Sequence, residues 1–275
     1  MAAPAIFDSC TLFGPWPRHA ADLTAEALLH GMAQNNITRS LVTSTTGIYY
    51  DYRQGNAETL ALAKANAAQL FPVGTLDPRA YPECLEEAQT RASEGFRLFR
   101  FFPSRQNWPI RFAPFRELLQ KCDELKVPVA VEISQPGDCT ELAEATSQLK
   151  APLLLAGVTP SLLGEVLAVM RADVLAQKSL NAILRREVGE MMRTEVSAVM
   201  RTDSKFYLET THLLAPNTFE MIRDAIPFGA SKLVFASYAP LRYLSAALAP
   251  ILTSTLSDDD KAAILGGNLK TLLTK

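Results

Sequence analysis

The residues that could carry chemistry lie at the ends of short apolar runs. The first run, "IFDSCTLF", holds Asp8 and Cys10 just before a Gly-Pro turn. Later runs contain Arg100, Glu132 and Glu209 at or near their ends. A carboxylate in an apolar setting can act as a general acid or base, and an arginine fork binds a carboxylate or phosphate through two hydrogen bonds. Glu132 and Arg100 are therefore candidate catalytic residues that act on a small anion.

Histidine and cysteine offer few further candidates. The histidines are His19, His30 and His212, and His212 has the best placement because it follows an apolar run in "ETTHLL". We take it as the third candidate catalytic residue. The four cysteines have neither CxxC nor zinc-like spacing, which is typical of free thiols in a reducing cytoplasm. Cys10 would need an adjacent cation to become a nucleophilic thiolate, and its other interpretation is a small buried hydrophobic residue.

The elements that must position these residues follow from an alternation that runs along the whole chain. Amphipathic helical patterns of about a dozen residues separate short apolar runs, which is typical of parallel strands wrapped by helices. The eight runs are 5–10, 38–44, 70–76, 96–102, 127–134, 151–157, 205–211 and 232–237. Eight such units in about 250 residues favour an α/β fold of the (β/α)8 TIM-barrel type. We expect residues 1–275 to form a single barrel.

One helical segment is longer than this rhythm requires. Residues 161–203, between the sixth and seventh runs, contain apolar residues at close to helical spacing over more than forty positions. One interpretation is a long outer helix, or two, packed on the barrel. The other is a lid or a homo-oligomer contact, because methionine-rich stripes suit adaptable contacts.

The composition limits the class of partner. The chain is 48% hydrophobic and 20% charged, with a net charge of -2 and no Lys/Arg run, which disfavours nucleic acid and anionic membranes as partners. No stretch approaches the 18 apolar residues of a membrane span, and the start of the chain resembles no secretory signal. We expect a cytoplasmic protein that binds a small molecule.

Two segments after predicted strands are suited to holding that molecule. The segments "TSTTGIYYDYRQGN" and "FFPSRQNWPIRF" combine aromatic, hydroxyl and basic side chains, among them Tyr49, Arg105 and Trp108. Loops that follow barrel strands converge on one face. We predict that these residues line a pocket for an anionic ligand; the alternative is that they cap an empty barrel mouth.

Longer motifs carry a family resemblance. The run "LFPVGTLDPRAYPECLEEAQTRASEGFRLFRFFP" is followed in order by "FRELLQKCDELKVPVAVEIS", "GASKLVFASYAP" and "ILGGNLKTLL". Together they resemble the amidohydrolase-2 family, which includes metal-dependent decarboxylases, hydrolases and hydratases as well as lactonases. The resemblance spans nearly the whole chain except residues 161–203. It implies the same TIM barrel as the alternation.

The resemblance fails at the metal ligands. The family's D-x-H-x-H motif reads Asp8-Ser9-Cys10-Thr11-Leu12, so the acid is kept and both histidines are replaced. The other positions that the resemblance matches to ligands or frequent histidines carry Phe102, Glu132, Gly157 and Tyr238. We therefore expect no metal and no cofactor. An atypical zinc site from Cys10, Glu132 and His212 or Glu209 has suitable ligand types but no recognised spacing.

The resemblance also places several residues at the barrel mouth. It implies that Asp8 orders the first strand, that Glu132 faces inward, and that Tyr238 fills the space of an acid or donates a hydrogen bond. We expect a salt bridge between Arg100 and Glu132, which could open to receive an anion. The candidate substrate-binding residues are Asp8, Cys10, Tyr49, Arg105, Trp108, Glu209 and Tyr238.

Two classes of function remain open. The first is a metal-independent hydrolase, lactonase or lyase that acts on a small anionic carboxylate through Glu132, Arg100 and His212. The second is a catalytically inactive barrel that binds a ligand or serves as an assembly module through residues 161–203. Loss of the metal ligands argues against the ancestral chemistry and does not exclude new chemistry, because fold and function separate readily.

Overall fold

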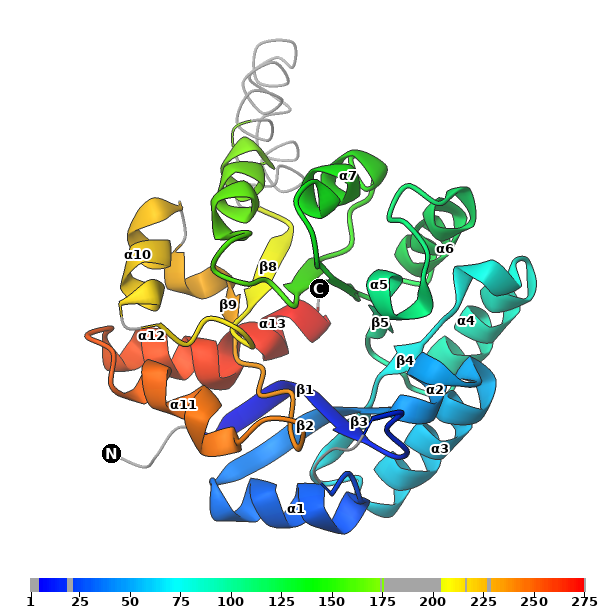
Figure 1. Cartoon of the computed structure of the whole chain (residues 1–275), viewed down its shortest axis with the longest axis horizontal. Coiled ribbons are helices and arrows are strands. Elements are labelled where there is room, and N and C mark those ends of the chain that lie inside the picture. The colour runs from blue at the N-terminus through cyan, green and yellow to red at the C-terminus, as the bar shows by residue number, and fades with distance from the viewer. Residues whose placement is uncertain are drawn as a thin grey trace, which may run out of the picture.

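The eight predicted runs form a closed parallel barrel surrounded by helices (Figure 1). The computed structural model describes residues 5–18, 22–173, 175, 204–215, 217–226 and 229–274 of the 275-residue chain. The fold is thus the (β/α)8 TIM barrel that the alternation predicts. Parallel strands of this kind are buried on both faces, which explains their almost continuous apolar sequences.

Each strand overlaps one of the predicted runs, and β1 continues three residues past the predicted end of its run, at residue 10. The strands are β1 (Ile6–Phe13), β2 (Ile37–Ser44), β3 (Leu70–Pro72), β4 (Gly74–Thr75), β5 (Phe99–Phe101), β6 (Val129–Glu132), β7 (Leu153–Ala156), β8 (Phe206–Glu209) and β9 (Leu233–Val234). They pair in parallel in the order β1-β2-β3 and β4 to β9. The elements β3 and β4 share the run 70–76 and are divided only at Val73, so they occupy one strand position of the barrel.

Two seams complete the barrel. The amide of Val73, between β3 and β4, donates to the carbonyl of Val42 on β2 (3.0 Å), which continues the hydrogen bonding past the division. At the other seam the amide of Ser9 on β1 donates to the carbonyl of Phe235 after β9 (3.0 Å). The first and last strands are thereby joined, and the described strands present no open edge between them.

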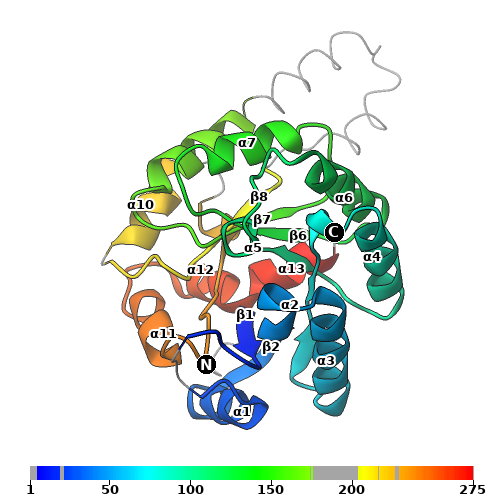
Figure 2. The same ribbon diagram turned by 45° about the vertical axis from the view of Figure 1, so that its right-hand side comes forward.

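The outer helices form a ring around the strands (Figures 1 and 2). They are α1 (Ala25–Gln34), α3 (Tyr52–Ala65), α4 (Glu83–Ser93), α6 (Ala113–Glu124), α7 (Asp138–Ala145), the helical residues 163–173, α10 (Thr218–Ala225) and α11 (Leu244–Leu252). The chain ends with α12 (Asp258–Ala262), a π-helical turn (Ala263–Gly267) and α13 (Asn268–Thr274). Within the described ranges, none of the helices has the length and apolar character needed to cross a membrane.

The long segment 161–203 is described only in part. Residues 163–173 are helical, as the pattern predicts, while 174 and 176–203 lie outside the described residues. A homo-oligomer contact through this segment therefore stays a prediction.

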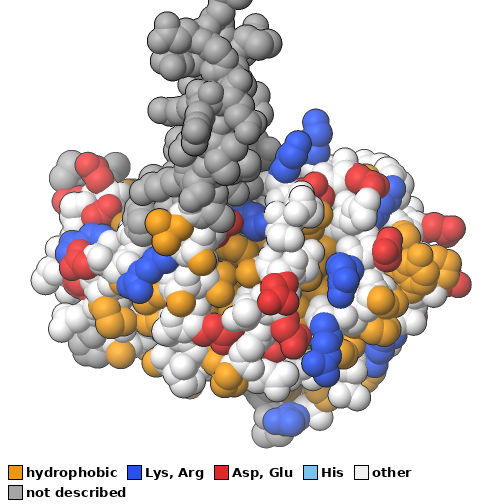
Figure 3. Space-filling model, turned by 90° about the horizontal axis from the view of Figure 1, so that it is seen from above, with side chains coloured by type: hydrophobic (Ala, Val, Ile, Leu, Met, Phe, Trp, Pro, Cys, Tyr) orange, Lys and Arg blue, Asp and Glu red, His pale blue; other side chains and the backbone are white. Residues whose placement is uncertain are grey.

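On the face seen in Figure 3, acidic and basic side chains are interspersed among apolar ones.

The core has two main layers. Side chains on the outer faces of the strands, such as Phe99 and Leu155, pack against the helices in the larger layer. Inward-facing side chains such as Ala130 and Tyr207 fill the interior, where Leu269 of α13 joins them. The interior is thus packed with side chains. The charged residues Arg100, Glu132 and Glu209 lie beyond this packed layer, at or near the carboxyl ends of their strands.

Two short helices were not expected from the sequence. α2 (Thr45–Tyr49) and α5 (Pro103–Gln106) lie in the two segments predicted as loops. The side chain of Ser44 caps α2 by accepting from the amide of Thr46 (3.2 Å), and a proline begins α5, where its missing N–H costs nothing. Helices of four or five residues are too short to show a periodicity, so only the structure reveals them.

Candidate ligand-binding site

A buried ion pair crosses the barrel interior. Arg100 on β5 binds Glu209 at the end of β8, with Nη1–Oε2 at 3.0 Å and Nη2–Oε1 at 2.5 Å. The same guanidinium donates to the carbonyl of Ser9 (2.9 Å), and the Ser9 hydroxyl donates to Glu209 (2.7 Å). Both charged side chains are at most 3% exposed. The predicted Arg100–Glu132 salt bridge is therefore wrong, because Glu209 takes the arginine.

Glu132 has a different arginine as its partner. Arg105 on α5 approaches it with Nη2–Oε1 at 2.8 Å and Nε–Oε2 at 2.9 Å, the fork geometry that matches a carboxylate. Nη1 of the same arginine donates to the hydroxyl of Tyr49 on α2 (2.9 Å). Burial acts to lower the pKa of Arg105, but the hydrogen bonds to Glu132, its charge, and the nearby Tyr238 and Tyr49 together outweigh burial and raise this pKa. The short helix α5 therefore positions Arg105, and the short helix α2 positions Tyr49, which binds it.

Aromatic rings flank the Arg105 guanidinium. Its Cζ lies 5.9 Å from the ring centre of Trp16 and 5.5 Å from that of Tyr238. Trp16 in turn packs edge-on against Tyr49, with ring centres 5.1 Å apart. Cations over aromatic faces are attracted by the ring quadrupole, so these rings hold the guanidinium in place.

A cavity of about 590 Å³ opens beside this arginine. Its walls combine two cations, one carboxylate, two aromatic rings and three hydroxyls, supplied by Trp16, Pro17, Arg18, Tyr49, Ser104, Arg105, Glu132 and Ser134. The size lies within the usual range for small-molecule pockets. Trp16, Arg18 and Ser134 were not among the predicted site residues. The position of Trp16 in the "GPWP" turn after the first strand is the signal that could have identified it.

An apolar layer packs against the aromatic rings of the barrel mouth. Leu12, Ile48 and Phe102 are buried together and contact Trp16 and Tyr238. Leu12 and Phe102 stand at two positions that the family resemblance matches to histidines. Apolar side chains occur at these positions because they pack together and against the rings of the mouth.

Asp8 and Cys10 lie under this layer and do not line the mouth cavity. Oδ1 of Asp8 accepts from the amides of Cys10 (3.0 Å) and Ser237 (3.0 Å), which ties β1 to the segment after β9. Asp8 thus orders the first strand, as the sequence predicts. Burial raises the pKa of Asp8 to about 7 and also raises that of the Cys10 thiol. Cys10 is therefore a protonated, buried thiol.

His212 lies just beyond β8 as a neutral imidazole. Burial, and next the charge of Arg242, lower its pKa. Nη2 of Arg242 lies 2.7 Å from Nδ1 of His212. A guanidinium can only donate, so Nδ1 accepts and Nε2 carries the imidazole proton.

A second, much smaller chamber lies at the centre of the barrel. It measures about 10 Å³ and is lined by Arg100, Phe102, Glu132, Ala156, Gly157, Glu209, Thr211, His212 and Tyr238. Four of the matched positions, Phe102, Glu132, Gly157 and Tyr238, thus meet at one place. Gly157 has φ +70°, and a Cβ there would lie 2.8 Å from Cγ of Glu132. A glycine is therefore needed at position 157 to leave room for the Glu132 side chain.

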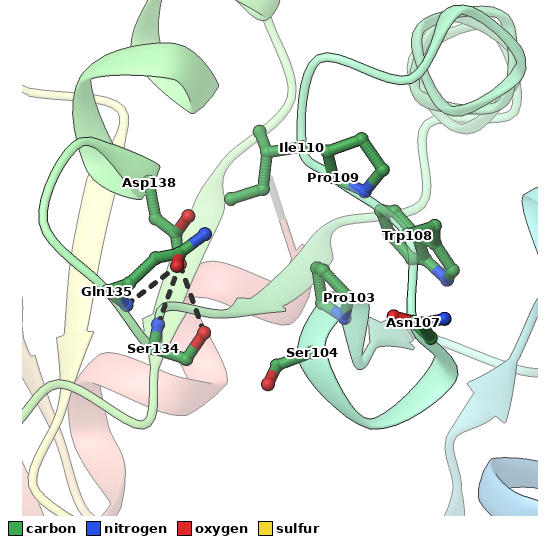
Figure 4. A pocket seen from close by; sticks show the side chains of 9 residues that line it. All are labelled: Pro103, Ser104, Asn107, Trp108, Pro109, Ile110, Ser134, Gln135 and Asp138. Atoms are coloured by element: carbon green, nitrogen blue, oxygen red, sulfur yellow. Dashed lines mark hydrogen bonds between the residues drawn. The ribbon is translucent and has the colours of Figure 1, made fainter.

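Trp108 does not join the mouth cavity. It packs against Phe101 and Phe115, with ring centres 6.5 and 4.7 Å away, and its indole N–H donates to Gln106 (3.1 Å). One edge borders a separate hollow of about 330 Å³, shown in Figure 4. Asp138 lies on the opposite side of this hollow, where its carboxylate accepts from the backbone N–H and hydroxyl of Ser134.

The residues at the barrel centre do not fit a divalent metal ion. Glu132 and Glu209 are each bound by an arginine fork, and Cys10 is a protonated thiol. Within the described ranges, no three His, Cys, Asp or Glu residues come together as a metal-binding group. A cation site needs ionised ligands free to coordinate, and here guanidinium groups occupy them.

Comparison with known proteins identifies the architecture. No protein-family model and no curated protein matches the chain. A solved structure of amidohydrolase II matches with a TM-score of 0.71 and 16% identity, over 98% of this chain and 100% of that one. A 2,6-dihydroxybenzoate decarboxylase complexed with 2,6-dihydroxybenzoate matches with a TM-score of 0.68 and 12% identity, over 99% and 100%. The chain therefore has the same TIM-barrel fold as these proteins.

Another neighbour with the same fold contains a bound metal ion. A variant 5-carboxyvanillate decarboxylase from Novosphingobium aromaticivorans, with bound manganese and 3-methoxy-4-hydroxy-5-nitrobenzoic acid, matches with a TM-score of 0.68. Its identity is 11%, over 99% of this chain and 97% of that one. The structure of that protein contains manganese. The barrel of this chain contains two arginine–carboxylate pairs, Arg100–Glu209 and Arg105–Glu132.

Proposed function

We propose that this amidohydrolase-like barrel binds a small aromatic carboxylate in the mouth cavity and acts on it without a metal ion. The observation that carries the proposal is the Arg105 fork, which binds the Glu132 carboxylate at the wall of a cavity of about 590 Å³. An arginine held in this geometry is already oriented for the carboxylate of a ligand.

Binding proceeds by exchange of one carboxylate for another. The ligand carboxylate replaces Glu132 on the Arg105 fork, so the arginine keeps its two charge-assisted hydrogen bonds. Tyr49 continues to hold the third nitrogen of the guanidinium through its hydroxyl. The exchange avoids leaving a half-buried guanidinium unpaired, which would be costly.

The aromatic part of the ligand is accommodated by the cavity walls. Trp16 and Tyr49 present ring surfaces beside the arginine, and Ser104 and Ser134 supply hydroxyls at the rim. The ligands named for two of the solved neighbours are aromatic carboxylates, which is consistent with this choice of substrate class.

Glu132 is the group placed for chemistry. Once released from Arg105 it lies next to the bound ligand and can take up or return a proton, the role of a general acid–base. Arg100 and Glu209 hold each other inside the barrel and make no contact with the mouth cavity. Their contribution is to position the strands, so the predicted catalytic role of Arg100 is not part of the proposal.

A non-catalytic ligand-binding barrel is the second candidate, and one observation favours it. Among the described residues that line the cavity, Glu132 is the only carboxylate and none is a histidine, so a ligand there meets one candidate acid–base group. Product formation from a bound aromatic carboxylate distinguishes an enzyme from this alternative.

Calorimetric titration with 2,6-dihydroxybenzoate tests the proposed binding. The full chain is expected to bind it, and Arg105→Gln to bind it roughly 10- to 100-fold more weakly, since hydrogen bonds to charged groups contribute about 1.5–3 kcal/mol. Arg105→Lys, which keeps the charge and loses the fork, is expected to lie between them.

The matched control is Arg111→Gln. Arg111 is exposed, lies 3.7 Å from Glu141 and does not line the mouth cavity, so its replacement should leave binding unchanged. The double variant Arg105→Gln/Glu132→Gln removes the unpaired carboxylate and separates lost recognition from lost stability. Equal binding by the wild type and Arg105→Gln would refute the proposal.

A further inference from the structure

Two buried hydroxyls at the barrel centre are unexplained by the packing around them. Thr211 Oγ1 and the Tyr238 hydroxyl are shielded from solvent and have no hydrogen-bond partner within the described part of the chain. Buried hydroxyls nearly always have a partner, from protein or from ordered water. Both residues line the same central chamber of about 10 Å³.

The chamber has the size and the polarity of a site for one water molecule. A volume of about 10 Å³ corresponds to a single water, and a buried water needs two to four polar partners. Besides the two hydroxyls, the Nε2–H of His212 is a donor on this wall and the carboxylate of Glu132 is an acceptor. Tyr238 stays a protonated phenol, because burial raises its pKa.

We propose that the chamber binds one water molecule between Thr211, Tyr238, His212 and Glu132, and that this water is the nucleophile of a hydrolytic reaction. Glu132 is the link, since it lines both the chamber and the mouth cavity. The occupancy of the chamber stands on its own residues, while the catalytic role rests on the proposed function of the mouth cavity.

The reaction class that this arrangement serves is hydrolysis of an ester or lactone carried by the aromatic carboxylate. The water oxygen forms a bond to the ester carbonyl carbon while Glu132 takes one water proton. The carbon–oxygen bond to the alcohol then breaks, and Glu132 returns the proton to the leaving oxygen. The products are an acid and an alcohol, and Glu132 is restored.

A high-resolution crystal structure of the full chain without ligand tests the occupancy. One water peak within hydrogen-bond distance of Thr211 Oγ1 and the Tyr238 hydroxyl is expected. An empty chamber, or a metal ion identified there by its anomalous scattering, would overturn the inference. This experiment needs no ligand, so its result is independent of whether the mouth cavity binds carboxylates.

Thermal unfolding of Thr211→Val is a second test of whether the chamber holds a water molecule. If the hydroxyl holds a water, the variant loses a hydrogen bond and its melting temperature falls. If the hydroxyl is truly unpartnered, its removal raises the melting temperature, which contradicts the inference. Thr75→Val is the matched control, because Thr75 Oγ1 is also buried without a described partner and lies outside the chamber.

Hydrolysis of acetylsalicylate, an aromatic carboxylate that carries an ester, tests the catalytic role. Thr211→Val and Tyr238→Phe should each lower kcat about tenfold with little change in KM, while Arg105→Gln should raise KM. A wild-type protein that binds salicylate but does not hydrolyse acetylsalicylate would overturn the catalytic role. Failure to bind salicylate at all would instead refute the proposed function.

Discussion

Arg100 and Glu209 neutralise each other inside the barrel. The guanidinium comes from β5 and the carboxylate from β8, and two hydrogen bonds of 3.0 and 2.5 Å join them across the interior. Ser9 on β1 contacts both members of the pair. Three separate strands therefore meet at one pair of charges, and neither charge has access to solvent.

Removal of one member of this pair should destabilise the protein strongly. Arg100→Met or Glu209→Gln leaves an uncompensated group in the interior, which typically costs about 3–5 kcal/mol. The double variant should lose less than the two single losses combined, because it removes both charges. Urea unfolding of the four proteins measures this coupling.

The exposed pair of Arg223 and Asp224 provides the comparison. Their side chains are 38% and 67% exposed, so Arg223→Met should change the unfolding free energy far less than Arg100→Met does. A single-variant effect at Arg100 as small as that at Arg223 would contradict the buried-pair description.

Gly157→Ala should disturb Glu132 directly. A Cβ at this position would lie 2.8 Å from Cγ of Glu132, and the backbone already has φ +70°. We expect a loss of about 2–4 kcal/mol in unfolding free energy, from backbone strain plus overpacking. The affinity for the carboxylate should also change, because Glu132 competes with the ligand for Arg105. Urea unfolding and calorimetric titration measure the two effects.

Gly137→Ala separates the strain from the contact. Gly137 has φ +97°, and a Cβ there would meet no atom within 4 Å. Its variant should therefore show only the backbone cost, about 1–2 kcal/mol, with binding unchanged. If both variants bind the carboxylate equally well, Gly157 does not position Glu132.

Asp8 should make stability depend on pH. Its pKa is about 7 in the folded chain against an ordinary value of 3.8, so between these pH values the folded state binds more protons than the unfolded state. This contribution is fully present below about pH 4 and is lost as pH rises to about 7. About three pH units at ~1.4 kcal/mol per unit set its size at roughly 4 kcal/mol.

Asp8→Asn removes this titration and keeps a side-chain oxygen that can accept from the amides of Cys10 and Ser237. The difference in unfolding free energy between the wild type and Asp8→Asn should shift against the wild type as pH rises from 4 to 7, and stay level above pH 8. Urea unfolding at a series of pH values provides the measurement. A difference that is constant with pH would show that Asp8 has an ordinary pKa.

The barrel could be predicted from the sequence because its strands and helices have distinct hydrophobic patterns. The partner of Glu132 could not. In the strand register Arg100 is level with Ala130, two residues below Glu132, so it points into a deeper layer. Arg105, brought back over the mouth by α5, reaches Glu132 instead. Sequence spacing indicates the strand that carries a residue, but not its depth within the barrel.

Trp108 shows the same limit for a loop residue. Its type and its position after the fourth strand favoured a ligand contact. The chain, however, turns at Asn107, which has φ 57°, and the indole packs against Phe101 and Phe115 on the outer side. A single left-handed residue reverses the direction of the side chain, and no periodic pattern reports such a turn.

The most direct test of a guanidinium-based site is titration of 2,6-dihydroxybenzoate into the full chain after dialysis against EDTA, repeated with added Mn²⁺, with the metal content of each sample measured. Recognition by Arg105 predicts the same dissociation constant in both samples and no stoichiometric metal. Binding that requires Mn²⁺, with one ion per chain, would contradict it.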